Sequence, residues 1–302
     1  MKPFNFINRK INNNACSVLL SLIAASFLAG CSDVPSANHD PMVIAHQGGV
    51  GQWPSNTLFA FQQSKQLGTV DEFELDIQLS SDGHIVLIHD KTVDRTTNGQ
   101  GLVSDMTLTQ LQKLDAGYTW QDESQPQAFP FRKKGITIPT LKEIFEHFPQ
   151  QAMSIEIKQE STELAVAFCK MVKQYQKEEA LVVSSFYHEN LLAFREACPS
   201  VATAASGQEA ERYIIASKVG LGWLFKPNAQ VLQLPMASGS ITVLTAGFIN
   251  QAHDHGYRVD AWTINEKADM TSLMDLGIDG LITDYPSRLL NTLTQQHQAA
   301  KL

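Results

Sequence analysis

The stretch FELDIQLSSDGHIVLIHD, residues 73–90, decides how the rest of the chain is read. Two apolar runs, 72–79 and 84–90, flank the polar sequence SSDG. Strand-forming runs around a cluster of turn residues are typical of two strands joined by a tight turn. We therefore expect one strand over each run, with His89 at the end of the second.

Acidic residues interrupt the first of these runs at alternate positions. Strand residues alternate between faces, so Glu74 and Asp76 share one face, whereas Phe73, Leu75 and Ile77 share the other. Carboxylates are seldom buried without a partner, and two of them on a stiff strand suit a hard divalent cation. These residues alone leave a second reading open, in which the strand is half exposed and its acidic face is solvated.

Strand-like and helix-like segments alternate through the chain, which favours βα units around a parallel sheet. Further strands are expected at 42–46, 152–158, 181–186, 257–264 and 280–284, and helices at 55–68, 141–148 and 161–175. We predict a TIM (β/α)8 barrel, because many chemically functional residues stand at carboxyl ends of strands, where barrel enzymes have their sites. They are His46, His89, Glu156, Lys158, Trp262 and Asp284. A doubly wound open sheet is the alternative, although no G-x-G-x-x-G follows the first strand.

Residues 91–139, after the third strand, are too many for a simple βα loop. We predict an insertion that forms a small cap over the site, and a loose surface excursion is the alternative. Leu108, Leu111 and Leu114 recur at helical spacing, so at least part of the insertion is expected to pack.

The first 30 residues are typical of a secretory signal, with Lys2, Arg9 and Lys10 ahead of a short apolar run. LAGC, ending at Cys31, resembles a bacterial lipobox. The resemblance implies cleavage before Cys31, acylation of its thiol and a polar tether over 31–41. Ser32 at the next position favours the outer membrane, facing the periplasm. An ordinary signal peptide followed by a chance cysteine is the alternative.

Composition limits the remaining possibilities. The formal charge is −8, and loss of Lys2, Arg9 and Lys10 would leave 20 basic against 31 acidic residues, a charge of −11. Such an acidic domain does not suit a nucleic-acid partner. The length fits one barrel over 42–290, followed by a polar tail over 291–302. Cys169 and Cys198 could form a disulfide or remain two buried thiols.

Several motifs in one order resemble the glycerophosphodiester phosphodiesterase family. They are AHQGG, PSNTLFAF, ELDIQLSSDGHIVLIHDKTVDRTTNGQG, EIK, SSF, AWTIN and GIDGLITDYP, which together span most of residues 45–286. The resemblance implies a TIM barrel with an inserted cap. It also implies metal-dependent hydrolysis of small glycerophosphodiesters to sn-glycerol 3-phosphate and an alcohol.

The resemblance assigns a role to each matching position. Glu74, Asp76 and Glu156 would bind one divalent cation, and His46 and His89 would be the catalytic pair. Lys158 would neutralise the phosphate, Trp262 would line the alcohol pocket, and Asn56 would orient the ligands.

The chemistry suits these residue types. A phosphodiester is an anion, so its transition state needs positive charge at the phosphate oxygens, and two histidines can serve as base and acid near neutral pH. Three carboxylates suit Ca²⁺ or Mg²⁺ rather than zinc, and we expect Ca²⁺ more than Mg²⁺. Attack by water and attack by the substrate's own neighbouring hydroxyl, through a cyclic phosphate, both remain open.

Two positions depart from the family pattern. Gln47 stands where arginine is usual and would offer the substrate only neutral hydrogen bonds, and Ser55 stands where glutamate is usual. If the usual arginine and glutamate form an ion pair, replacing both together leaves no unpaired charge. We expect an active enzyme with altered phosphate handling. The alternatives are a lipoprotein that binds phosphodiesters or lipid with little turnover, and a related phospholipase D-like activity.

Overall fold

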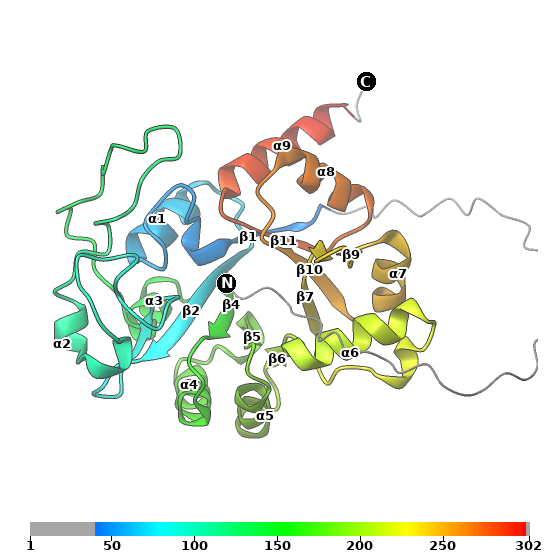
Figure 1. Cartoon of the computed structure of the whole chain (residues 1–302), viewed down its shortest axis with the longest axis horizontal. Coiled ribbons are helices and arrows are strands. Elements are labelled where there is room, and N and C mark those ends of the chain that lie inside the picture. The colour runs from blue at the N-terminus through cyan, green and yellow to red at the C-terminus, as the bar shows by residue number, and fades with distance from the viewer. Residues whose placement is uncertain (1–39, 300–302) are drawn as a thin grey trace, which may run out of the picture.

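Eight parallel strands form a ring in the computed structural model, which describes residues 40–299 (Figure 1). Hydrogen-bonded neighbours follow the order β6, β5, β4, β2, β1, β11, β10, β7, and a parallel bridge between Ala204 and Val231 joins the two ends. The strands are β1 (Met42–Ala45), β2 (Glu72–Leu79), β4 (Ala152–Ile157), β5 (Leu181–Ser184), β6 (Ala202–Thr203), β7 (Val231–Pro235), β10 (Arg258–Trp262) and β11 (Gly280–Thr283). The predicted TIM barrel is confirmed.

Helices cover the outside of the ring (Figure 1). They are α1 (Leu58–Gln66), α3 (Leu141–His147), α4 (Thr162–Gln174), α5 (His188–Ala197), α6 (Gly207–Lys218), α7 (Ala246–Asp254), α8 (Lys267–Asp275) and α9 (Pro286–Ala299). Side-chain caps set where several begin: the Thr140 hydroxyl accepts from the Glu143 amide, and Ser161 accepts from Leu164. Fully buried aromatic residues, among them Phe73 and Phe168, fill the layer between strands and helices.

The last helix corrects one expectation. The segment 291–302 was expected to be a polar tail, but α9 continues to Ala299 and buries Thr292 and Leu293. In this helix most apolar residues are followed by at least two polar ones. The sequence therefore resembles a solvated tail, although one face of the helix is buried.

A ninth strand, β3 (Ile85–Leu87), lies outside the ring and runs antiparallel to β2, with Leu87 opposite Ile77. The tight turn over 80–83 therefore sends the chain back along β2. The Ile88 amide donates to the Asp76 carbonyl at 3.1 Å, so His89 returns to the level of the acidic residues. His89 thus reaches the site through a hairpin rather than from a barrel strand.

The insertion over 91–139 packs as a small unit with η2 (Val103–Asp105) and α2 (Leu108–Leu111). Its own core includes Val103, Leu111 and Ile138, as the helical spacing of the leucines suggested. Figure 1 shows it at the left, beside α1 and α3. None of residues 91–139 lines the cavity at the carboxyl end of the barrel, so the expected cap contributes no wall to that cavity.

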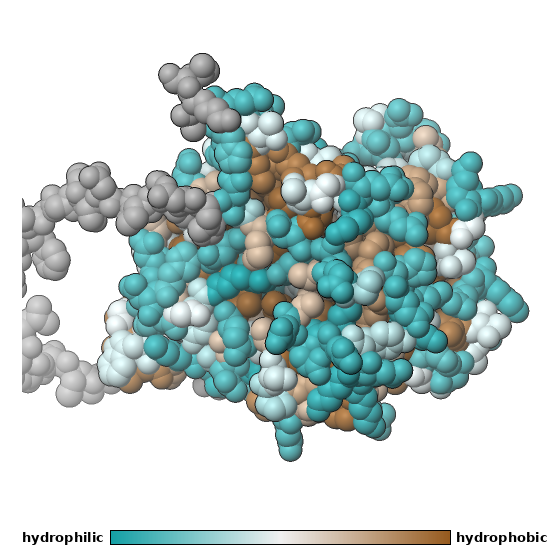
Figure 2. Space-filling model, turned by 180° about the vertical axis from the view of Figure 1, so that it is seen from behind, coloured by the Kyte–Doolittle hydropathy of each residue, from teal (hydrophilic) through white to brown (hydrophobic). Residues whose placement is uncertain are grey.

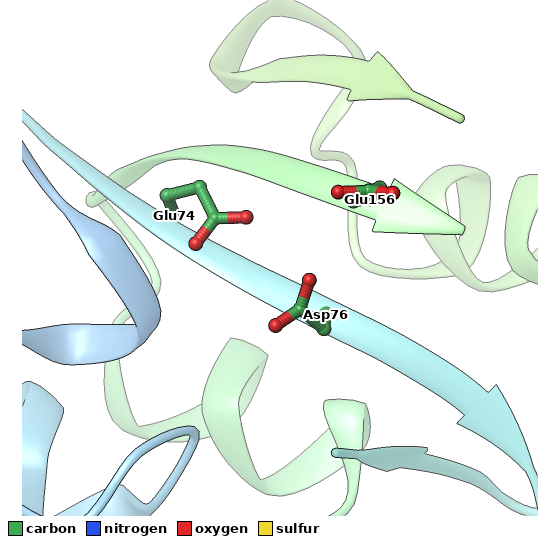
Figure 3. A group of neighbouring side chains, drawn as sticks. All are labelled: Glu74, Asp76 and Glu156. Carbon is green, nitrogen blue, oxygen red and sulfur yellow. The ribbon is translucent and has the colours of Figure 1, made fainter. Parts of the chain in front are cut away.

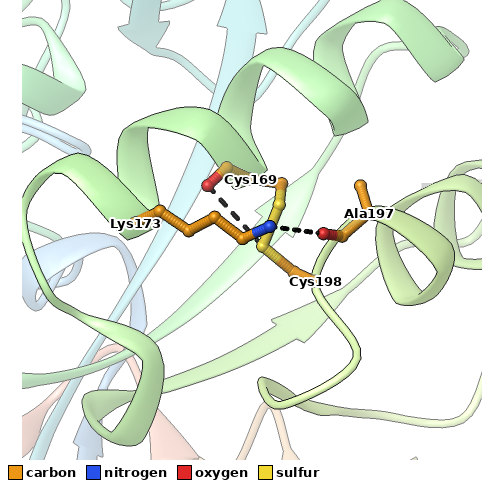
Figure 4. The surroundings of a disulfide bond; sticks show 4 residues. All are labelled: Cys169, Lys173, Ala197 and Cys198. Atoms are coloured by element: carbon orange, nitrogen blue, oxygen red, sulfur yellow. Dashed lines mark hydrogen bonds between the residues drawn. A yellow bond between two sulfur atoms is a disulfide. The ribbon is translucent and has the colours of Figure 1, made fainter.

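A disulfide joins Cys169 in the middle of α4 to Cys198 just after α5 (Figure 4), which settles the choice left open above. Beside it, Lys173 Nζ donates to the Ala197 carbonyl at 2.8 Å. The remaining short elements are η1 (His46–Gly48), η3 (Glu178–Ala180), η4 (Gly222–Leu224) and the hairpin of β8 (Ala237–Ser238) and β9 (Ile241–Thr242). Within residues 40–299, no helix combines the length and the apolar character needed to cross a bilayer.

Candidate active site

Three carboxylates converge inside the barrel (Figure 3). Glu74 and Asp76 project from β2, and Glu156 projects from β4. Asp76 and Glu156 are register partners, and one oxygen of each of the three groups lies within 4.8 Å of the others. Asp76 is fully buried and Glu74 is 7% exposed, so the strand is not the half-exposed one of the alternative reading.

Lys158 bridges two of these carboxylates. It follows β4 directly, and its Nζ lies 3.2 Å from Asp76 Oδ1 and 2.6 Å from Glu156 Oε2. Burial opposes its charge, but Asp76 and Glu156 outweigh burial and raise the pKa of Lys158. Lys158 is therefore a fixed positive charge at the carboxyl end of the barrel.

Asn56 holds Asp76 with two hydrogen bonds. Its Nδ2 donates to Asp76 Oδ2 at 2.8 Å, and its Oδ1 accepts from the Asp76 amide at 3.0 Å. Asn56 has a φ of 56°, a left-handed conformation that asparagine tolerates better than most residues. Asn56 therefore fixes the Asp76 carboxylate from one side, and its role toward a bound ligand stays a prediction.

The acidic cluster carries more negative charge than Lys158 neutralises. Burial and the neighbouring Asp76 raise the pKa of Glu74 to about 8, and burial raises the pKa of Glu156 to about 6. Asp76 Oδ1 is buried and accepts no hydrogen bond of good geometry from the residues of the described barrel. Three oxygen donors with a shortage of positive charge fit a divalent cation such as Ca²⁺ or Mg²⁺.

His46 follows β1 and is fixed from behind by an acid. Its Nδ1 lies 2.5 Å from Asp284 Oδ1, and the other Asp284 oxygen accepts from Asn265 Nδ2 at 2.7 Å. Burial opposes protonation, yet Glu74 and Asp284 raise the pKa of His46 to about 9. Because Asp284 takes Nδ1, the Nε2 atom of His46 faces the cluster, 3.8 Å from Glu74 Oε2.

His89 is held in the same way from the other side. Its Nδ1 lies 2.7 Å from Asp90 Oδ1, and Arg95 donates through Nε to Asp90 Oδ2 at 2.6 Å. Burial lowers the pKa of His89, which favours the neutral ring. Arg95 belongs to the insertion, so this segment supports His89 from the flank.

Sequence reasoning assigned no role to several of these supports. Asp90, Arg95, Asn265 and Asp284 all stand inside the motifs that resemble the family, but nothing in the residues themselves pairs them with His46 or His89. Their contacts join segments that are far apart in sequence or lie in a loop, so periodicity could not reveal them.

The site opens into a cavity that His46, Glu74, His89, Glu156 and Lys158 help to line. The other lining residues are partly polar, among them Glu211, Gln233 and Ser238. The apolar ones include Phe186, Ala204, Ala210, Ile214, Leu234, Pro235, Val243 and Trp262. The rings of Phe186 and Trp262 meet edge to face with centroids 6.1 Å apart. Trp262 is therefore a wall of the same cavity as the two histidines.

Gln47 is buried beside the acidic cluster. It is 4% exposed, is not among the residues that line the cavity, and has a φ of 52°. Its backbone amide donates to Glu74 Oε2 at 2.9 Å. The backbone of Gln47 therefore holds a carboxylate, and contact of its side chain with the substrate stays a prediction.

Comparisons with known proteins agree with this geometry. The model of the glycerophosphoryl diester phosphodiesterase family matches residues 46–288. A glycerophosphodiester phosphodiesterase of Caldanaerobacter subterraneus is 34% identical over 264 residues, which cover 83% of this chain and 96% of that protein. Mouse lysophospholipase D is 28% identical over 275 residues, which cover 83% of this chain and 85% of that protein.

Solved structures show the same architecture. A phosphodiesterase of Oleispira antarctica, in complex with the product sn-glycerol-3-phosphate, superposes with a TM-score of 0.66 at 28% identity, covering 84% of this chain and 97% of that one. A glycerophosphoryl diester phosphodiesterase structure from Silicibacter pomeroyi has a TM-score of 0.70 at 24% identity. The match covers 87% of this chain and 95% of that one.

Proposed function

Because this chain belongs to the glycerophosphoryl diester phosphodiesterase family, we propose that it hydrolyses glycerophosphodiesters to sn-glycerol 3-phosphate and an alcohol, with one divalent cation. The observation that carries the proposal is the pair of acid-held histidines, His46 and His89, beside three carboxylates and Lys158 at a cavity. The product named for the Oleispira antarctica structure is the one proposed here.

The carboxylates and Lys158 would gather positive charge at the phosphate. Glu74, Asp76 and Glu156 would hold the cation, which when bound supplies charge to the phosphate oxygens and stabilises the transition state. Lys158 adds a second positive charge from the same edge of the barrel. We favour Ca²⁺ over Mg²⁺, because a shell of several carboxylates suits the larger and less strictly octahedral ion.

The two histidines would move protons. An attacking oxygen bonds to phosphorus while the bond from phosphorus to the leaving alcohol oxygen breaks. One histidine would accept a proton from the attacking oxygen, and the other would give a proton to the departing alcohol. If water attacks, sn-glycerol 3-phosphate forms directly. If the substrate's own hydroxyl attacks, a cyclic phosphate forms, and water must then open its ring while the two histidines exchange roles. Asp90 and Asp284 each bind a ring Nδ1, so both Nε2 atoms are left for this exchange.

The test uses a fragment that begins at Ser32, since residues 40–299 contain the complete barrel and its core. Release of sn-glycerol 3-phosphate from glycerophosphocholine and glycerophosphoethanolamine is followed with Ca²⁺, with Mg²⁺ and with EDTA. His46→Ala is compared with His147→Ala, which alters an exposed histidine on α3. Release that requires both the cation and His46 supports the proposal. A folded protein that binds cation but releases nothing would favour the substrate-binding lipoprotein.

The apolar side chains that line the cavity favour a second candidate, lysophospholipase D activity. Ala210, Ile214, Leu234 and Val243 could receive an acyl chain. Mouse lysophospholipase D is among the similar proteins. Choline release from lysophosphatidylcholine, measured against glycerophosphocholine in the same preparation, separates the two. A higher kcat/KM for the acylated substrate would favour the second candidate.

We also propose that Cys31 is acylated and anchors the enzyme to the outer membrane, facing the periplasm. The signal over 1–30, Cys31 and most of the tether over 31–41 lie outside the described residues, so the support is the lipobox resemblance of LAGC. The mass of the N-terminal peptide from the processed protein tests this. A Cys31→Ser variant should lose the added mass and leave the membrane fraction.

A further inference from the structure

Exposed large hydrophobic side chains concentrate in one short segment. Of the eleven such side chains in the described part of the chain, six lie between residues 215 and 225. They are Ile215, Val219, Leu221, Trp223, Leu224 and Phe225, and their exposed fractions run from 43% to 68%. This 215–225 patch covers the end of α6 and η4. Figure 2 shows that brown, hydrophobic side chains reach the surface on this face of the molecule among teal, hydrophilic ones.

The charged side chains within the segment that carries the 215–225 patch are basic. From residue 212 to residue 226 they are Arg212, Lys218 and Lys226, all of them exposed, although Glu211 immediately precedes this segment and Asp254 of α7 lies near Tyr213. Lys218 Nζ also donates to the Thr242 carbonyl, beside the exposed Ile241 of β9. Tryptophan and aliphatic residues flanked by basic ones are typical of segments that bind the surface of an anionic bilayer.

The position of the 215–225 patch relates it to the cavity. Helix α6 lines the cavity with Gly207, Ala210 and Ile214, whereas the next residue, Ile215, is half exposed. Helix α6 therefore contributes residues both to the wall of the cavity and to the 215–225 patch. The proposed acyl anchor also limits the distance, because Cys31 to His39 is nine residues and can span at most about 30 Å.

We propose that the 215–225 patch docks on an anionic phospholipid bilayer, with Trp223, Leu224 and Phe225 entering the headgroup region. An exposed apolar surface of this kind would promote aggregation if nothing covered it. Docking would add a second attachment to the single acylated cysteine and would hold α6, and with it one wall of the cavity, at the lipid surface. The inference does not depend on the proposed reaction.

The test measures flotation with vesicles, using the fragment from Ser32 so that no acyl chain contributes. Vesicles of phosphatidylglycerol with phosphatidylethanolamine are compared with phosphatidylcholine vesicles. The variant Trp223→Ser/Leu224→Ser/Phe225→Ser is compared with Val166→Ser/Leu192→Ser, which removes exposed apolar side chains from α4 and α5. Circular dichroism melting verifies that each variant is folded, independently of any enzymatic activity.

We expect the wild-type fragment and the Val166/Leu192 variant to float with anionic vesicles, and the triple variant to bind at least about tenfold more weakly. Lys218→Gln/Lys226→Gln should weaken binding to the anionic vesicles alone. The proposal is overturned if the wild-type fragment does not float, or if the triple variant floats equally well. It is also overturned if light scattering shows a wild-type dimer that the triple substitution dissociates, because the 215–225 patch would then be a contact between copies.

Discussion

Asp76 of β2 and Glu156 of β4 face each other as register partners on neighbouring parallel strands, and Lys158 Nζ lies within 3.2 Å of both. With Glu74 two residues earlier on β2, they form a buried cluster whose negative charge exceeds its positive charge. The barrel keeps this arrangement because strands fix the carboxylates before any ligand arrives. A bound cation would relieve the repulsion, and the first two predictions follow from that.

Glu156→Gln should weaken cation binding by at least about tenfold, because the charge of the ligand set controls affinity for hard cations. Isothermal titration with Ca²⁺ measures the change. Glu160→Gln is the matched control, since Glu160 is an exposed acid four residues further along. Equal affinities for both variants would remove Glu156 from the proposed ligands.

Cation-induced stabilisation should grow as pH rises from about 5 to about 8. Burial raises the pKa of Glu156 to about 6 and that of Glu74 to about 8, above the ordinary value near 4.3. Groups with raised pKa values stabilise the metal-free fold at low pH, and this contribution is lost as pH rises through the folded values. The cation competes with those protons, so the Tm difference between Ca²⁺ and EDTA should widen over this range. A constant difference would contradict the assignment.

Asp284→Asn should lower kcat at least about 100-fold while changing KM little. The amide can donate to Nδ1 of His46 and stabilise the wrong tautomer, as replacement of the acid does in serine proteases. Steady-state kinetics with glycerophosphocholine give the two constants, and Asp275→Asn on the exposed end of α8 serves as control. A rise in KM with unchanged kcat would assign Asp284 to substrate binding.

Arg95→Ala should reduce kcat more than it reduces stability. The Arg95 side chain is 54% exposed, and exposed ion pairs contribute about 0–1 kcal/mol to the free energy of unfolding. Its two bonds to Asp90 nevertheless orient the acid that holds His89. Urea unfolding and kcat are measured on one preparation, and Arg95→Lys should recover part of the activity through a single bond. A kcat equal to that of the wild type would show that Asp90 orients His89 without help from Arg95.

Removal of the disulfide by Cys169→Ala/Cys198→Ala should lower the free energy of unfolding by about 3–4 kcal/mol, from the chain entropy of a loop of this length. The sequence separation of the two cysteines is 29. Urea unfolding of the variant and of the wild type with and without reductant measures the loss. The reduced wild type should approach the variant. If the reductant destabilises the variant equally, the effect does not come from this bond.

The sequence by itself determined the local pattern. Alternation along 72–79 predicted that Glu74 and Asp76 share a face, and the structure confirms it because side chains of a strand point to opposite sides. The helices predicted at 141–148 and 161–175 are present as α3 and α4, and each starts at a cap that acts on an amide only three residues away. These properties depend on neighbours in the chain.

Only the tertiary structure decided which distant residues meet. The hairpin return of β3 brings His89 to the acids, and the closed barrel places Asp284 against His46, 238 residues earlier. Arg95 from the flanking insertion reaches Asp90, and α4 and α5 bring Cys169 to Cys198. No local periodicity encodes such contacts, because they arise when the whole sheet closes and its connections take up the remaining space. Residue types and spacing therefore identified the chemistry, and the folded barrel set the distances at which it can operate.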